Sequence, residues 1–268
     1  MIAGRGLRTA RTIAAAAVYL FLVLPMMVVV LFSFSDRSYF TFPPTGFSLR
    51  WYEAAWDSGK FLGPALRSLV LATLATAVGA AVSVPAALAL RRMAPGRLRA
   101  LLEFVFLSAL IVPALIVGIA LLYSFNRFGL IDSFAALLAA HALIVFPFVF
   151  RAVLTSVMGL QQALIDASEI LGAAPLYTFR RVVLPSLVPG LASGAIFAFI
   201  VSLDQFTVSL FVTQSVQIVL PVAIYQYLFD VNDPVVAAVS TVLVVFGLLV
   251  AMVIDRFGWL RHLGGTGG

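Results

Sequence analysis

The stretch that decides the fold is VMGLQQALIDASEILGAAPLYTFRRVVLPSLVP, residues 157–189, which lies between longer apolar segments. Five apolar residues of its first half recur at the spacing of one helix face. They are Leu160, Ala163, Leu164, Ala167 and Leu171. Gly172 can adopt a left-handed turn at no Cβ cost, and Pro175 suits the first turn of a new helix. We therefore expect two short helices joined at Gly172, with Pro185 and Pro189 restricting the far end of the second.

Part of this stretch resembles the EAA loop of permease subunits of ABC importers. The family pattern is Glu-Ala-Ala, three residues, Gly, nine residues, Ile, one residue, Leu-Pro. Here Asp166-Ala167-Ser168 replaces the first triplet, Gly172-Ala173 follows at the same spacing, and Val182 replaces Ile before Leu184-Pro185. The three substitutions are chemically mild, and the spacing from Asp166 to Leu184 is intact.

The resemblance implies that residues 157–187, called the elbow below, dock into a cleft on a cytosolic ATPase and transmit its motion. The residues to which it assigns this role are Asp166, Ala167, Ser168, Glu169, Gly172, Ala173, Phe179, Arg180, Leu184 and Pro185. For Arg180 three roles remain open: a cytoplasmic anchor, a contact with an acidic ATPase surface, or a contact with lipid phosphate.

The composition is that of a membrane protein. Of 268 residues, 63% are hydrophobic and only 10% are charged, whereas a soluble domain has about a quarter charged residues. The formal net charge is +6, but the basic residues cluster at the ends of apolar runs, which argues against a nucleic-acid partner. There are no cysteines, so disulfides and thiolate chemistry are excluded.

The sequence predicts an all-α, polytopic membrane protein with one transmembrane domain over residues 1–268. A spanning helix needs about 20 apolar residues, and charge-free gaps of that length predict six spans. Their expected bounds are 12–35, 68–90, 102–125, 133–155, 187–211 and 234–255. Pro85, Pro113 and Pro147 lie in the second to fourth spans, either as ordinary kinks or as bends around a gated cavity.

Orientation follows from the basic residues. Six spans place both termini on one side, which would hold twelve of the 17 Lys and Arg residues and leave five on the other. The twelve are Arg5, Arg8, Arg11, Arg91, Arg92, Arg97, Arg99, Arg151, Arg180, Arg181, Arg256 and Arg261. The more basic side is normally cytoplasmic. We therefore expect an inner-membrane location with the elbow and both termini in the cytoplasm.

Asp204 is the one acidic residue well inside an apolar run. Such a residue usually faces a cavity or a partner, because a charge in the bilayer is costly. Two interpretations stay open: a hydrogen-bonded contact between helices, or a position on a translocation path that favours cations. Gln205, Thr207 and Tyr225 would belong to the same path, since residues 201–225 resemble the fifth span of spermidine/putrescine permeases.

Motifs for catalysis are lacking. The sequence has no G-x-x-x-x-G-K-[ST] phosphate loop, and its one lysine, Lys60, falls on the expected outer side. His141 has no acidic or histidine neighbour at ligand spacing, so no metal site is expected. We therefore expect no enzyme activity and no cofactor on this chain, with ATP and Mg²⁺ bound by a partner.

Taken with the resemblance, these features predict the permease subunit of a binding-protein-dependent ABC importer of type I. The solute would be small, a polyamine or another cation. The partners implied are a cytosolic ABC ATPase dimer, a second and different permease chain, an extracytoplasmic solute-binding protein and the lipid bilayer. Two alternatives are a stand-alone secondary transporter or channel, which would show inverted repeats, and an intramembrane enzyme.

Overall fold

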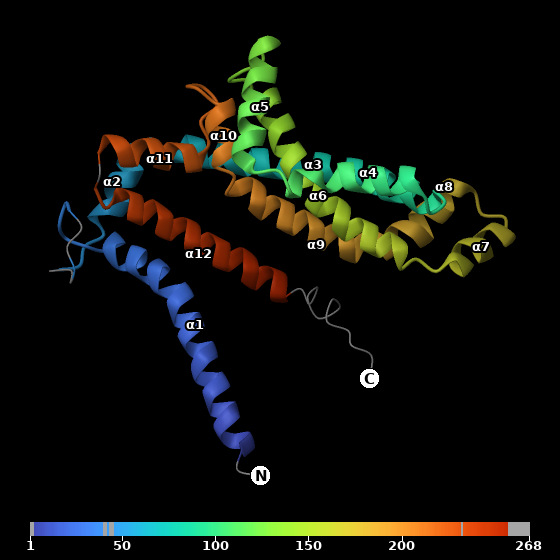
Figure 1. The fold of residues 1–268 in the computed structure, drawn as a ribbon. Coiled ribbons are helices and arrows are strands. Elements are labelled where there is room, and N and C mark those ends of the chain that lie inside the picture. Colours follow the sequence, from blue (N-terminus) through green and yellow to red (C-terminus); the bar gives the residue numbers. More distant parts are fainter. Residues whose placement is uncertain (1–2, 40–41, 43–45, 232, 257–268) are drawn as a thin grey trace. The chain divides into compact units, whose positions relative to one another are not determined.

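The computed structural model describes the chain except residues 1–2, 40–41, 43–45, 232 and 257–268. The described part is helical, as predicted, and its only strand-like pairing is an isolated bridge between Ser35 and Phe47. The helices, in chain order, are α1 (Ala3–Ser33), α2 (Arg50–Asp57), α3 (Leu62–Arg92), α4 (Arg97–Leu107), η1 (Ser108–Leu110), α5 (Ala114–Arg127), α6 (Phe134–Met158), α7 (Gln162–Ile170), α8 (Pro175–Thr178), η2 (Phe179–Val183), α9 (Leu184–Leu203), α10 (Thr207–Val212), α11 (Leu220–Asp230) and α12 (Val235–Arg256) (Figure 1).

The chain forms two compact units. Unit 1 comprises residues 1–62 and 224–250, and therefore holds α1, α2 and most of α11 and α12. Trp51 of α2 connects this helix to the segment that follows α1, because its indole N–H donates to the Ser35 carbonyl at 2.7 Å. Unit 2 comprises residues 63–223 and 251–268 and contains the elbow.

Four described helical segments are long and apolar enough to cross a membrane: Arg11–Ser33, Leu62–Arg92, Phe134–Met158 and Pro175–Leu203. The bent pair α4–η1 and α5 would make a fifth, and the apolar segment Val235–Val250 is shorter. The prediction of six spans at the stated bounds therefore remains a prediction. Both chain ends, expected in the cytoplasm, lie outside the described residues.

The third expected span is not a straight helix. Arg97–Leu110 and Ala114–Arg127 meet at 97° across residues 111–113. Pro113 causes the break, since it lacks an N–H and disfavours helical backbone at Val112. It then serves as the N-terminal cap residue of α5. Pro85 and Pro147, by contrast, lie inside α3 and α6 without ending them.

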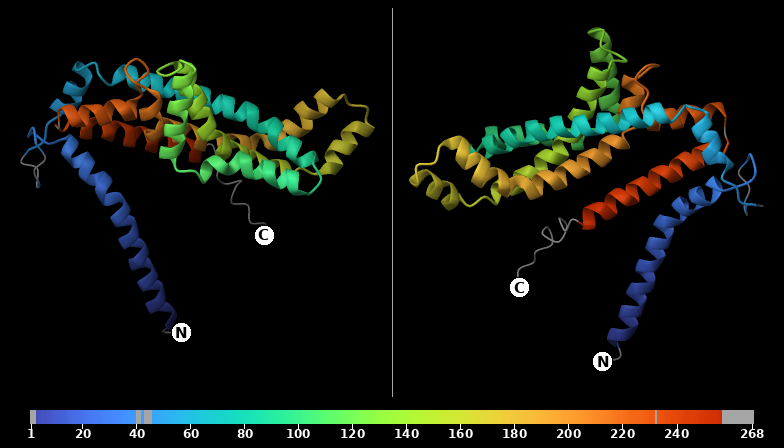
Figure 2. Two further views of the ribbon diagram at one scale, coloured as in Figure 1. Left: turned by 45° about the horizontal axis from the view of Figure 1, so that its top comes forward. Right: turned by 180° about the vertical axis from the view of Figure 1, so that it is seen from behind.

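The centre of unit 2 is the pair α6 and α9, which lie side by side over much of their length (Figures 1 and 2). Glycines make the close approach possible, because a Cβ at Gly190 would lie 2.6 Å from the Ala152 carbonyl oxygen and collide with the Ser156 hydroxyl. A Cβ at Gly194 would lie 3.0 Å from the Val149 Cα. The surrounding core is apolar and includes the fully buried residues Val145, Val149, Val153, Leu187 and Ala198.

This packing predicts that Gly190→Ala destabilises the protein. The added methyl group has backbone as its neighbour and cannot move aside, so the cost is about 1–3 kcal/mol. Thermal unfolding of the purified protein in detergent measures it. The control is Gly63→Ala in α3, where no heavy atom lies within 4 Å of the new Cβ. Equal unfolding midpoints for the two variants would contradict the proposed close contact.

Candidate functional site

The first half of the elbow ends in a Schellman motif at Gly172. The Gly172 N–H donates to the Glu169 carbonyl at 2.9 Å, and the Ala173 N–H donates to the Ser168 carbonyl at 3.1 Å. Gly172 has φ +76°, which is the left-handed conformation that this motif requires. The turn predicted from the sequence is therefore present, and it terminates α7 while supplying donors to the carbonyls of Ser168 and Glu169.

The second half of the elbow runs directly into the membrane segment. Pro175 occupies the first turn of α8, as predicted. A π-helical turn, η2, then joins α8 to α9, so Pro185 lies in the first turn of α9 and does not end the helix. A proline is tolerated there because the first N–H groups of a helix lack helical partners. The expectation that Pro185 and Pro189 limit the second helix is therefore wrong.

The two halves are held together and leave an apolar surface exposed. The hydroxyls of Ser168 on α7 and Thr178 on α8 lie 2.9 Å apart. No residue of α7 is buried, and Ile170 and Leu171 are each 86% exposed. Leu176 on α8 is also exposed. Apolar side chains gathered on an exposed loop are typical of a surface that binds another protein.

The residues assigned to the elbow by resemblance divide by exposure. Exposed are Asp166, Ala167, Glu169, Gly172, Arg180 and Pro185; partly buried are Ser168, Ala173, Phe179 and Leu184. The acidic residues and Arg180 are therefore accessible to a partner, whereas Phe179 packs against the apolar core of unit 2. Their docking role stays a prediction.

Arg91, at the end of α3, holds the start of the elbow in place through hydrogen bonds. The sequence indicated only that it is one of the basic residues at the end of an apolar run. Its guanidinium donates to the carbonyls of Val157 at 3.2 Å and Leu160 at 3.0 Å, and to the Gln162 side-chain oxygen at 3.1 Å. Gln162 in turn donates to the Asp166 carboxylate at 2.9 Å. One cation thus satisfies carbonyls at the end of α6, where a positive charge is favourable, and links α3 to the elbow.

At the other end of the α6–α9 pair, the helix is broken at Asp204 (Figure 1). α9 ends at Leu203, and α10 begins at Thr207. Asp204 is the C-terminal cap residue of α9, and its side chain is exposed. The expected continuous span over 187–211 is therefore interrupted at its only acid. A helix C-terminus carries partial negative charge, which adds to that of the carboxylate.

His141 of α6 spans this break. Its ring is buried, with Nδ1 2.8 Å from the Ser202 hydroxyl and Nε2 2.9 Å from the Ser209 hydroxyl. The Ser209 hydroxyl donates to the Gln205 carbonyl, so it accepts from the Nε2–H of a neutral ring, and Ser202 donates to Nδ1. The ring therefore holds the two helical pieces in register, a role that no sequence pattern indicates.

The remaining residues of the expected path are only partly brought together. Gln205 and Thr207 lie at the break beside Asp204, and both are partly buried. The Gln205 side-chain N–H group is buried without a hydrogen-bond acceptor among the described residues. An oxygen atom of a solute or of water would satisfy it. Tyr225 belongs to unit 1, where its ring lies 4.8 Å from that of Phe229.

Asp132 fixes the loop that follows α10, and the sequence pattern did not reveal it. Its carboxylate accepts hydrogen bonds from the backbone N–H groups of residues 214, 215, 216 and 217 at 3.0–3.1 Å. Burial alone would raise the pKa of this carboxyl, but the four donors outweigh it and hold the pKa well below its usual range. The carboxylate therefore stays ionised and anchors the loop.

Comparison with known families identifies the class of protein. Residues 79–258 match the family described as binding-protein-dependent transport system inner membrane component.

The chain belongs to this family.

Two curated relatives and one solved structure match this chain over most of their lengths. The spermidine/putrescine transport system permease protein PotC of Escherichia coli strain K12 is 28% identical over 94% of each chain. The permease protein PhnV of Salmonella choleraesuis, named for 2-aminoethylphosphonate transport, is 28% identical over 96% of this chain and 97% of its own. A solved bacterial ABC transporter involved in import of the acidic polysaccharide alginate matches with a TM-score of 0.77, covering 94% of this chain and 96% of that chain at 16% identity.

Family membership confirms the central prediction: the chain is a multi-pass permease subunit of an ABC importer, with the type I importer fold. It is a transport subunit and not an enzyme, and the family works with an ATPase and a binding protein on other chains. The elbow and the broken helix are therefore the candidate sites for coupling and for solute passage.

For an importer permease, Gly172→Val is expected to separate ATP hydrolysis from transport. No heavy atom lies within 4 Å of the new Cβ, so any effect comes from the left-handed backbone, which costs a β-branched residue about 1–3 kcal/mol. ATP hydrolysis and solute uptake are measured in proteoliposomes containing the whole transporter. Gly172→Asn is the control, since asparagine tolerates this conformation. Wild-type uptake by Gly172→Val would show that the turn is not needed for coupling.

Arg91→Gln is expected to loosen the elbow in the same assay. The variant loses hydrogen bonds from a charged donor, each worth about 1.5–3 kcal/mol, so uptake per ATP hydrolysed falls several-fold. Arg92→Gln removes the same charge from the exposed neighbouring residue and serves as the matched control. If both variants lose coupling equally, the positive charge at this end of α3 matters and the hydrogen bonds of Arg91 do not.

Proposed function

We propose that this permease forms the path for a small cationic solute of the polyamine class. The observation that carries the proposal is the exposed Asp204 carboxylate at the C-terminus of α9, in the middle of a broken helix. The carboxylate and the helix C-terminus both favour a cation. The relative PotC is named for spermidine and putrescine, which are polyamines. PhnV is named for 2-aminoethylphosphonate, whose ammonium group is accompanied by an anionic phosphonate, so the support for a cation comes from PotC.

The proposal includes an orientation with the elbow in the cytoplasm. Support comes from the excess of basic residues on the side that holds the elbow, twelve against five. Only there can a cytosolic ATPase bind the exposed apolar residues of α7 and α8. In this orientation α6 runs toward the cytoplasm and α9 runs away from it.

The mechanism is alternating access driven by partner chains. ATP and Mg²⁺ bind to the ATPase dimer, and their higher affinity for one state shifts the population of the whole transporter. Movement of the elbow is passed to α9, because α8, η2 and α9 follow one another without a gap. A second permease, which we expect to be a different chain, and an external binding protein complete the assembly.

The test is uptake of radiolabelled spermidine by proteoliposomes containing the permease, its ATPase, its second permease and its binding protein. We expect ATP-dependent uptake, and Asp204→Asn is expected to raise KM about tenfold, since it removes one charge-assisted contact. Asp204→Glu keeps the charge and should retain more of the uptake.

The control is Asp57→Asn, which changes an exposed acid on α2 and is expected to leave uptake unchanged. Unchanged KM in Asp204→Asn would assign Asp204 to packing only. Uphill uptake by the permease alone, without ATP, would instead support the stand-alone transporter considered above.

A further inference from the structure

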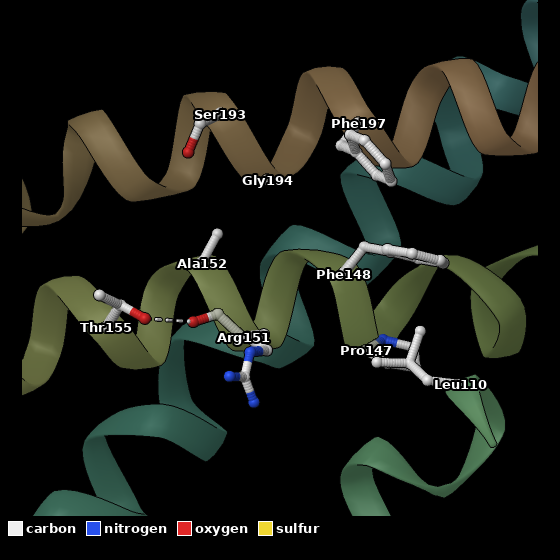
Figure 3. Close-up of a pocket in the computed structure, with 9 residues that line it drawn as sticks. All are labelled: Leu110, Pro147, Phe148, Arg151, Ala152, Thr155, Ser193, Gly194 and Phe197. Atoms are coloured by element: carbon white, nitrogen blue, oxygen red, sulfur yellow. Dashed lines mark hydrogen bonds between the residues drawn. The ribbon is translucent and has the colours of Figure 1, made fainter. Parts of the chain in front are cut away.

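A groove on unit 2 lies beside the contact between α6 and α9 and has no part in the function described so far. It has a volume of about 300 Å³. Nine residues from η1, α6 and α9 line it: Leu110, Pro147, Phe148, Arg151, Ala152, Thr155, Ser193, Gly194 and Phe197 (Figure 3). Arg151 is the one charged residue among them.

The Arg151 guanidinium is the unusual feature of this groove. It belongs to a helix that is long and apolar enough to span a membrane, and it forms no ion pair or side-chain hydrogen bond within the described part of the chain. A charge within a spanning helix is unfavourable unless it reaches an anion or the membrane surface. Arg151 lies seven residues before Met158, the last residue of α6, which is about 10 Å along the axis. A long arginine side chain can bridge much of that distance.

The polar and apolar walls of the groove are separated along its length. Arg151 and Thr155 lie toward the end of α6 that adjoins the elbow, and Ser193 lies near the middle of α9. The Thr155 hydroxyl donates to the Arg151 carbonyl at 3.0 Å and the Ser193 hydroxyl to the Gly190 carbonyl at 3.1 Å, so the Arg151 guanidinium is the donor that the groove offers to an anion. Phe148 and Phe197 lie toward the opposite ends, with ring centroids 5.3 Å apart (Figure 3). The site is therefore polar and cationic next to the elbow and apolar toward the middle of the bilayer.

We propose that this groove binds an anionic phospholipid of the cytoplasmic leaflet. The phosphate contacts the Arg151 guanidinium, and one acyl chain lies against the two phenylalanine rings. The inference rests on the cytoplasmic orientation of the elbow proposed above, because only then does the polar end of the groove face the headgroups. A polyamine is repelled by Arg151, so this site is distinct from the one at Asp204.

The test measures lipid bound to the purified full-length chain, by native mass spectrometry after titration with phosphatidylglycerol or phosphatidylcholine. We expect preferential binding of phosphatidylglycerol and a fall of about tenfold in its affinity in Arg151→Gln, since a charge-assisted contact is lost. Arg127→Gln, at the end of α5, makes the same charge change outside the groove and should bind as the wild type does. Phe197→Trp fills the apolar end and is expected to weaken lipid binding while retaining the charge.

Three results would overturn the proposal. One is equal phosphatidylglycerol binding by Arg151→Gln and Arg127→Gln. Another is displacement of the lipid by inorganic phosphate at the same concentration, which would indicate a site for soluble anions. A third is loss of the lipid from wild-type chain assembled with its second permease, which would assign the groove to contact between permeases. The orientation is tested separately by labelling a cysteine placed at the exposed Glu169. Neither lipid binding nor labelling requires uptake of spermidine, so failure of this inference is distinguishable from failure of the proposed function.

Discussion

The close contact between α6 and α9 is the constraint on which the rest of unit 2 depends. It requires hydrogen in place of a side chain at Gly190 and Gly194, because the space is taken by backbone atoms of α6. Two helices packed this tightly have little freedom to slide, since interiors of this density transmit displacement. α9 has 20 residues, which is about 30 Å of helix. The pair therefore connects the elbow at one end mechanically to the broken helix at the other.

At both ends of this pair, polar backbone groups must be satisfied where a helix stops. In a membrane protein an unsatisfied carbonyl or N–H group is costly. At the elbow, Arg91 supplies donors to the end of α6, and the Gly172 turn satisfies the end of α7. At the break, His141 with its two serines holds α9 and α10 in register. The hydrogen bonds that allow these helices to stop also fix the geometry of the two sites. Asp204 remains exposed between α9 and α10.

The sequence predicted the features that depend on local chemistry. The turn at Gly172 and the helix start at Pro175 follow from backbone preferences, and both are present. The features it missed depend on partners far along the chain. Arg91 contacts residues 157–162, and Asp132 contacts residues 214–217. No local pattern marks such pairs, because each residue alone resembles an ordinary charge at the end of an apolar run. The break at Asp204 was missed for a related reason, since the hydropathy of residues 201–212 is that of a continuous span.

The charges along the α6–α9 pair bear on what the permease can carry. A solved transporter of the same fold takes part in import of an acidic polysaccharide, so the fold does not determine the sign of the solute's charge. In this chain two charged side chains lie at different depths along the helix pair. Asp204 follows the last residue of α9, at the end away from the elbow. Arg151 lies on α6, about two turns of helix from the elbow. The proposed path places a cation at the first position, whereas the second lies in the proposed lipid groove. An anionic lipid at Arg151 would therefore neutralise a charge outside the path, and the proposed preference for cations depends on Asp204.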